Sequence, residues 1–172
     1  MLASVRGLDA DFEAFVTGRS PALLRTAVLL TGDRYDAEDL LQTALLRVAR
    51  HWSGALDNPD AYTRRVLVNL AVDRARRRRR HPERLGEVPE QPGLTVRIAV
   101  EDRDELLAAL RALPARQRAT VVLRFWEDLS VAETAALLGC TEGTVKSATS
   151  KGLARLRTVL TELDEGADHA DR

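Results

Sequence analysis

Two stretches of this sequence carry basic and polar side chains at spacings that suit contact with nucleic acid. One is RARRRRR, residues 74–80, which contains five consecutive arginines. Arginines bind phosphates with salt-dependent affinity but read no base sequence. The other is TVKSATSKGLAR, residues 144–155, whose polar helix face offers hydroxyl and amino groups to phosphates and base edges in a major groove. The candidates on that face are Thr144, Lys146, Ser147, Ser150, Lys151 and Arg155.

Patterns for catalysis or metal binding are missing from the sequence. The three histidines, His51, His81 and His169, are scattered, and Cys140 has no partner at metal-ligand spacing. We find no phosphate-binding glycine loop and no nucleophile elbow. The sequence therefore predicts no catalytic residue, no metal site, no cofactor and no enzymatic activity.

The charges of the chain are segregated although they balance. Lys+Arg and Asp+Glu each total 26 among 172 residues, but residues 64–84 are mostly basic and residues 101–105 are mostly acidic. A basic face concentrates phosphates and an acidic face repels them, so this segregation favours a nucleic-acid partner. Only 4% of residues are aromatic, so we expect an aliphatic core with six aromatic anchors. These are Phe12, Phe15, Trp52, Tyr62, Phe125 and Trp126.

The cysteine content and the short apolar runs indicate the cellular compartment of the protein. A single cysteine, Cys140, excludes an internal disulfide and is typical of a reducing compartment. The N-terminal residues have no apolar signal-peptide core, and the longest apolar run, residues 27–30, is far too short to span a bilayer. We therefore expect a cytoplasmic protein without membrane insertion.

The basic run belongs to a predicted unit of three helices. Apolar residues recur at helical spacing over 12–30, where Gly18 and Pro21 are expected to interrupt the helix or restart it. A second helix follows to about residue 52, capped by Asp33 or Asp36. Asn58 is expected to cap a third helix that runs to residue 80. Prolines and glycines then interrupt every helical period, which predicts a flexible linker over 82–100.

The polar stretch belongs to a second predicted helical unit. Its first helix ends at Leu113-Pro114, and the pair Ser130 and Glu133 has the spacing of a capping box. Gly139 permits a tight, left-handed turn, and Thr141 is expected to cap the last helix. A short helix, a glycine turn and a polar second helix form the helix-turn-helix pattern. An ordinary helical hairpin with a solvated polar face is the alternative, and a solvated helix end is the alternative for the arginines.

Three segments together resemble one family. DAEDLLQTALLRVARHW, PDAYTRRVLVNLAVDRARR and the region from LPARQR to LARLR are similar to bacterial RNA polymerase sigma factors of the extracytoplasmic-function type, within a subgroup called the SigE family. The resemblance covers residues 12–160 in order. It implies an all-α protein with two small domains, a three-helix promoter-melting and polymerase-binding domain and a four-helix helix-turn-helix domain. The expected divisions are a region-2-like domain over 8–81, a linker over 82–100, a region-4-like domain over 101–163 and an acidic tail over 164–172.

The resemblance also implies roles for particular residues. Leucines left exposed between carboxylates would bind the polymerase clamp, and the candidates are Asp36, Glu38, Asp39, Leu41, Gln42 and Leu45. Single-stranded promoter DNA would be held by Asp57, Asn58, Tyr62, Arg64, Arg65 and Asn69. Backbone phosphates would be contacted by Arg74, Arg76, Arg77, Arg78, Arg79 and Arg80. The polar face of the last helix would read upstream duplex DNA.

Two positions depart from the family pattern. Many members have a basic residue just before the asparagine of the third helix, where this chain has Val68. Many members also have a more basic run in the recognition helix, where this chain has ATSKG at 148–152. The base preference of the family therefore cannot be transferred to this chain.

The function expected from these observations is recruitment of core polymerase to promoters and initiation of DNA-templated transcription. The expected partners are core RNA polymerase, promoter DNA and an anti-sigma protein, and the free chain is expected to be a monomer. An autonomous helix-turn-helix regulator is the alternative, although no helix for the dimer interface of such a regulator is evident in the sequence.

Overall fold

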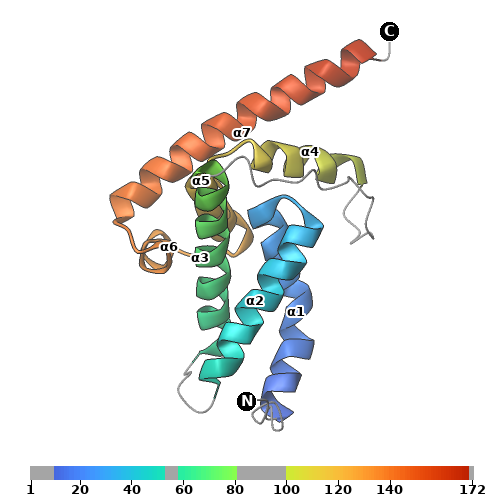
Figure 1. Ribbon diagram of the computed structural model, residues 1–172. Coiled ribbons are helices and arrows are strands. Elements are labelled where there is room, and N and C mark those ends of the chain that lie inside the picture. Colours follow the sequence, from blue (N-terminus) through green and yellow to red (C-terminus); the bar gives the residue numbers. More distant parts are fainter. Residues whose placement is uncertain (1–9, 53–57, 81–99, 171–172) are drawn as a thin grey trace.

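The computed structural model describes residues 10–52, 58–80 and 100–170, and every regular element in these ranges is a helix (Figure 1). The first unit consists of α1 (Ala10–Thr31), α2 (Arg34–His51) and α3 (Pro59–Arg80). The second consists of α4 (Val100–Arg111), α5 (Ala115–Val121), the π-helical segment η2 (Val122–Trp126), α6 (Val131–Leu138) and α7 (Glu142–Ala170). The all-α expectation is confirmed, whereas Asp57 and residues 82–99 of the expected linker lie outside the described residues.

One expectation about helix continuity is wrong. Gly18 and Pro21 do not break the first helix, because α1 is continuous from Ala10 to Thr31. Proline removes one helical hydrogen bond, but Phe12 and Leu23 are buried on either side of this region and hold both halves of the helix against the core. The last helix, α7, continues to Ala170 and so includes residues 164–170 of the expected acidic tail. A formed helix gains one hydrogen bond for each residue added, which favours this extension.

The predicted helix caps are confirmed. The Asp33 carboxylate accepts a hydrogen bond from the N–H of Asp36 at 2.8 Å, and the Asn58 side chain accepts one from the N–H of Ala61 at 3.0 Å. Ser130 and Glu133 form the reciprocal capping box, with distances of 3.1 and 2.7 Å. These interactions satisfy N–H groups that have no partner inside the helix.

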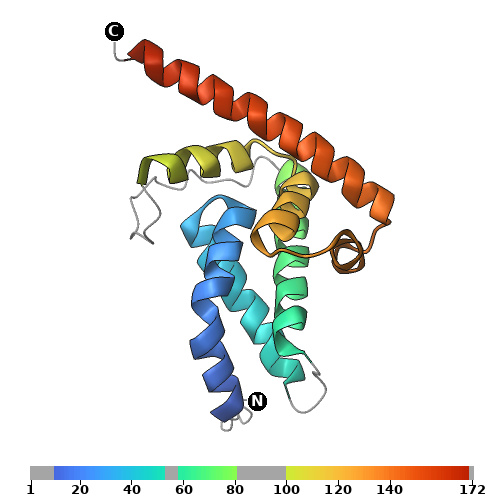
Figure 2. The same ribbon diagram turned by 180° about the vertical axis from the view of Figure 1, so that it is seen from behind.

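The two units pack against each other and share one hydrophobic core. Buried leucines of the first unit, among them Leu40 and Leu67, belong to the same cluster as Ala119, Val122 and Leu123 of the second unit. Figure 2 shows the second unit lying across one end of the three-helix unit, with α7 outermost. Two separate helical units were expected from the sequence, and this shared core was not. No helix within the described ranges is long and apolar enough to cross a membrane.

Five of the six expected aromatic anchors divide into two groups. Phe12 and Phe15 pack on Trp52, with ring centroids 5.0 and 5.1 Å apart, as expected of core anchors. Phe125 and Trp126 are 59% and 45% exposed, so the expectation that they are core anchors is wrong. They lie in η2, where the N–H of Glu127 bonds to the carbonyl of Val122. The wider turn of a π-helix changes the register of the side chains, and only the first part of η2 faces the core.

Gly32 lies where the two units meet, and we predict that the substitution Gly32→Ala destabilises the protein. Its φ is +78°, and an added Cβ would overlap the side chain of Arg111, whose Nε donates to the Gly32 carbonyl at 2.5 Å. The loss should exceed about 1 kcal/mol, because both backbone strain and the overlap oppose alanine. Urea unfolding measures this free energy.

Gly18→Ala is the matched control for that substitution. Gly18 is an exposed residue inside α1, and an added Cβ there meets nothing within 4 Å. This change should stabilise the protein by about 0.5–1 kcal/mol, because glycine is a poor helix former. Equal effects of the two substitutions would contradict the contact between Gly32 and Arg111.

Candidate polymerase and nucleic-acid interfaces

The first turns of α2 present the acidic surface predicted for a protein partner. Glu38, Asp39 and Gln42 are exposed, Asp36 is half-buried, and Leu45 is partly buried beside them. Negative charge is favoured here because the N-terminal end of a helix is electropositive. These side chains therefore form one surface on α2 without disturbing the core.

The expectation that Leu41 is exposed is wrong. Its side chain is only 7% exposed, and it packs in the shared core with Leu40 and Ala37. Leu41 lies on the apolar stripe of α2, so its helical spacing already indicated burial. The exposed leucine is Leu46, at 58%, which the sequence interpretation missed. Its position outside the apolar stripe was the signal that could have identified it.

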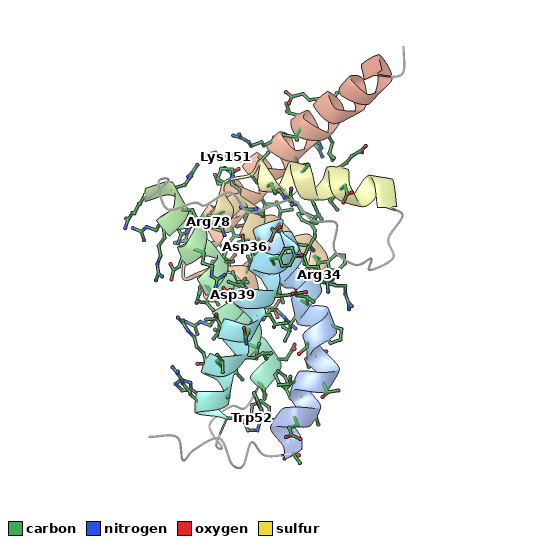
Figure 3. All side chains as sticks on the ribbon, turned by 45° about the vertical axis from the view of Figure 1, so that its right-hand side comes forward. Arg34, Asp36, Asp39, Trp52, Arg78 and Lys151 are labelled. Atoms are coloured by element: carbon green, nitrogen blue, oxygen red, sulfur yellow. The ribbon has the colours of Figure 1, made fainter. Side chains whose placement is uncertain are left out.

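The arginines at the end of α3 lie against this acidic turn. Arg78 pairs with Asp36 at 2.5 Å, and Figure 3 labels both residues, on α3 and α2. Arg74 pairs with Asp39. Two of the predicted phosphate contacts are thus paired with two of the predicted polymerase contacts. The remaining candidates, Arg76, Arg77, Arg79 and Arg80, are exposed, and no carboxylate in the described part of the chain pairs with them.

The outer face of α3 gathers most of the residues predicted to hold single-stranded DNA. Asn58 caps the helix, and Tyr62, Arg65 and Asn69 follow at helical spacing on one face. Arg65 and Asn69 are exposed, and Tyr62 is half-buried with its ring 5.9 Å from that of His51. An aromatic ring with basic and amide groups on one face suits unpaired bases.

Arg64 is separated from these residues by the turn of the helix. Its side chain is 19% exposed and pairs with Asp60 and, across the unit boundary at 2.9 Å, with Glu127. Glu127 also accepts a hydrogen bond from the Thr26 hydroxyl. Glu127 therefore ties α1 and α3 to the second unit, and Arg64 does not share the surface of the other candidates.

A hollow of about 780 Å³ adjoins the outer face of α3. Asn69 and Asp73 line it together with Arg76 and Arg79. Two further arginines, Arg47 from α2 and Arg116 from α5, line the same hollow, and the sequence interpretation missed them. They come from other helices, so neither the arginine run nor its periodicity pointed to them.

The helix-turn-helix has the predicted geometry. Gly139 adopts the left-handed conformation, with φ 60° and ψ 45°, and Thr141 accepts a hydrogen bond from the N–H of Thr144 at 3.2 Å. Val145 is fully buried under the turn. The six predicted contact residues of α7 are all exposed: Thr144, Lys146, Ser147, Ser150, Lys151 and Arg155.

The recognition helix packs closely on α5. An added Cβ at Gly152 would come within 2.9 Å of Val121 Cγ2, which accounts for a glycine inside this helix. A shallow hollow of about 560 Å³ lies between α5 and the first turns of α7. Thr144, Ser147 and Lys151 line it, and α5 adds Arg116 and Gln117, which the sequence interpretation did not include.

Comparison with known proteins assigns the chain to a family. The family model described as Sigma-70 region 2 matches residues 15–81, and that described as Sigma-70, region 4 matches residues 103–156. The chain is 44% identical to an RNA polymerase sigma-E factor of Streptomyces avermitilis, over 94% of this chain and 92% of that one. It is 33% identical to the ECF RNA polymerase sigma factor SigM of Mycobacterium tuberculosis, over 98% and 86% of the two chains.

Solved structures agree with this assignment. The sigma factor RpoE of Bartonella quintana, in complex with the anti-sigma factor NepR, has a TM-score of 0.68 at 26% identity, covering 89% of this chain and 98% of that one. CnrH, in complex with the cytosolic domain of CnrY, has the same fold, with a TM-score of 0.62 at 20% identity over 91% of each chain. The chain belongs to the extracytoplasmic-function sigma factors of bacterial RNA polymerase. Members of this class recruit core polymerase to promoters and direct transcription initiation.

Proposed function

We propose that the three surfaces divide the work of initiation among them. The acidic face of α2 binds core polymerase, the outer face of α3 holds the melted downstream element, and α7 reads the upstream duplex. The proposed divisions are 8–81 for polymerase and melted DNA, 82–100 for the linker, 101–163 for the duplex and 164–172 for the tail. The observation that carries this proposal is the exposure of polar and charged side chains on three separate faces.

The polymerase surface is proposed to comprise Asp36, Glu38, Asp39, Gln42 and Leu45, with Leu46 in the place first given to Leu41. A half-apolar surface with carboxylates suits a partner helix that buries the leucines and pairs with the acids. The ion pairs that Asp36 and Asp39 make with α3 do not oppose this role. Exposed ion pairs contribute only about 0–1 kcal/mol, so a partner can replace them at little cost.

For DNA, the proposal separates residues that position the backbone from residues that read bases. Arg76, Arg77, Arg79 and Arg80 are exposed, and they would bind phosphates without base preference. Tyr62, Arg65 and Asn69 would contact unpaired bases, because an aromatic ring stacks on any base and an amide bonds to its edge. Thr144, Lys146, Ser147, Ser150, Lys151 and Arg155 would contact the duplex in a major groove.

Further features of the proposal concern the state of the free chain. It would be a cytoplasmic monomer that acts as a polymerase subunit, with no catalytic role and no cofactor. An anti-sigma protein is a proposed third partner, supported by the similarity to a sigma factor solved in complex with one.

Run-off transcription with core polymerase tests the proposed function. An autonomous regulator is the competing function, and it differs in one measurable respect. Such a regulator binds its operator tightly and specifically without polymerase, whereas a sigma factor of the proposed kind needs core enzyme for specific transcripts.

A further inference from the structure

A pocket of about 300 Å³ lies between the two units and is lined by six arginines. Arg74, Arg78 and Arg79 come from α3, and Arg111, Arg118 and Arg155 come from α4, α5 and α7. Asp36 is the one carboxylate among the residues that line it. The pocket thus concentrates positive charge at the boundary of the units, where guanidinium groups from both repel one another.

Most of these guanidinium groups have no carboxylate partner among the described side chains. Arg74 and Arg78 pair with Asp39 and Asp36, but Arg111 and Arg118 donate to the backbone carbonyls of Gly32 and Thr31. No carboxylate pairs with Arg79 or Arg155 among the side chains that the structure describes, which are those of residues 10–52, 58–80 and 104–162. The charge inside the pocket is therefore largely uncompensated by the residues around it.

Arg118 is the most constrained of the six. Its Nε is buried and has no hydrogen-bond partner among the described residues, although its Nη1 donates to Thr31 at 3.2 Å. Burial lowers the pKa of Arg118, and the nearby charges of Arg111 and Arg78 lower it further. Arginine stays protonated in proteins, so the site holds a partly desolvated cation with a donor left over.

We propose that this pocket binds a small anion that carries phosphate groups. The planar guanidinium fork matches phosphate oxygens with two parallel hydrogen bonds, and such bonds are among the strongest in proteins. The volume lies at the lower end of the range of about 300–1,000 Å³ found for small-molecule sites, which suits a compact anion better than a polymer. Because both units contribute arginines, the anion bridges them and stabilises their packing.

A consequence for promoter binding rests on the proposed function. The anion occupies Arg79, which is proposed to contact promoter phosphates, and the neighbouring Arg74 and Arg78 of the same helix. It would therefore compete with DNA for the end of α3. It would also favour the arrangement in which the two units pack against each other. The binding itself is independent of the proposed function, since it is measured on the isolated chain.

Calorimetric titration of the full chain with inorganic pyrophosphate, at fixed ionic strength, tests the pocket. We expect saturable binding and a rise in the melting temperature of the chain. The double variant Arg79→Gln with Arg155→Gln removes two exposed pocket arginines. It should weaken pyrophosphate binding about tenfold or more, because each charge-assisted hydrogen bond from a guanidinium group to a phosphate oxygen adds substantially to the affinity.

The control is the double variant Arg80→Gln with Arg157→Gln. It removes the same charge from the same two helices, but neither residue lines the pocket. Pyrophosphate affinity close to that of the unchanged chain is expected here. The proposal is overturned by absent or non-saturable binding, or by equal weakening in both variants, which would indicate diffuse electrostatic attraction. It is also overturned if a hexaglutamate peptide binds through the pocket arginines while pyrophosphate does not.

Discussion

Replacing Asp39 by arginine is expected to weaken the binding of core RNA polymerase by about a hundredfold, the effect of losing one central interface residue. The Asp39 side chain is 64% exposed on the acidic face of α2. The change replaces an attractive charge by a repulsive one at the surface proposed to meet the polymerase. It should leave the fold intact, because the ion pair that its carboxylate forms with Arg74 is solvent-exposed and contributes little to stability.

Equilibrium titration of a fluorescently labelled chain with core enzyme measures this affinity, and two other variants isolate the cause. Glu162→Arg makes the same change in charge on an exposed position of α7 and should leave the affinity within about twofold of the original. Arg74→Ala removes the partner of Asp39 without touching the carboxylate, and it should not weaken binding. Equal affinity for Asp39→Arg and Glu162→Arg would contradict the assignment of the α2 surface.

Replacing Leu40 by alanine is expected to destabilise the folded chain by about 2–5 kcal/mol, because it leaves a cavity in a packed core. Leu40 is fully buried in the cluster shared by the two units. The total stability of small proteins is about 5–15 kcal/mol, so this single change removes a large part of it. Urea unfolding followed by circular dichroism gives the free energy.

Leu46→Ala is the matched control, since Leu46 lies on the same helix and is 58% exposed. Its effect on stability should stay within about 0.5 kcal/mol, as for most surface substitutions. A loss of stability as large as that of Leu40→Ala would mean that α2 turns a different face to the core. A reduced affinity for polymerase, by contrast, would agree with the proposed role of Leu46.

Features that depend on short stretches of sequence were predictable. The caps at Asp33, Asn58 and Ser130 and the left-handed turn at Gly139 each need only residues within three or four positions. Local hydrogen bonds and backbone preferences decide such features, so the sequence carries the whole signal. The three-helix unit and the helix-turn-helix follow from these caps and from the apolar periodicity.

Features that depend on packing between distant segments were not predictable. The exposure of Phe125 follows from the π-helical turn of η2, whose first residues, Val122 and Leu123, pack in the shared core. Arg74 and Asp39 are 35 positions apart and meet only because α2 and α3 pack side by side. The apolar residues of α5, such as Ala119, were consistent with a core of the second unit alone, so their periodicity did not reveal the shared core.

Run-off transcription from the DNA upstream of the gene tests the central claim most directly. Core polymerase alone and the chain alone should each give no specific transcript, and together they should give transcripts with a defined start. The Asp39→Arg variant should lose these transcripts in proportion to its loss of core binding. Tight, specific operator binding by the chain alone, without any core-dependent transcript, would contradict the account and favour an autonomous regulator.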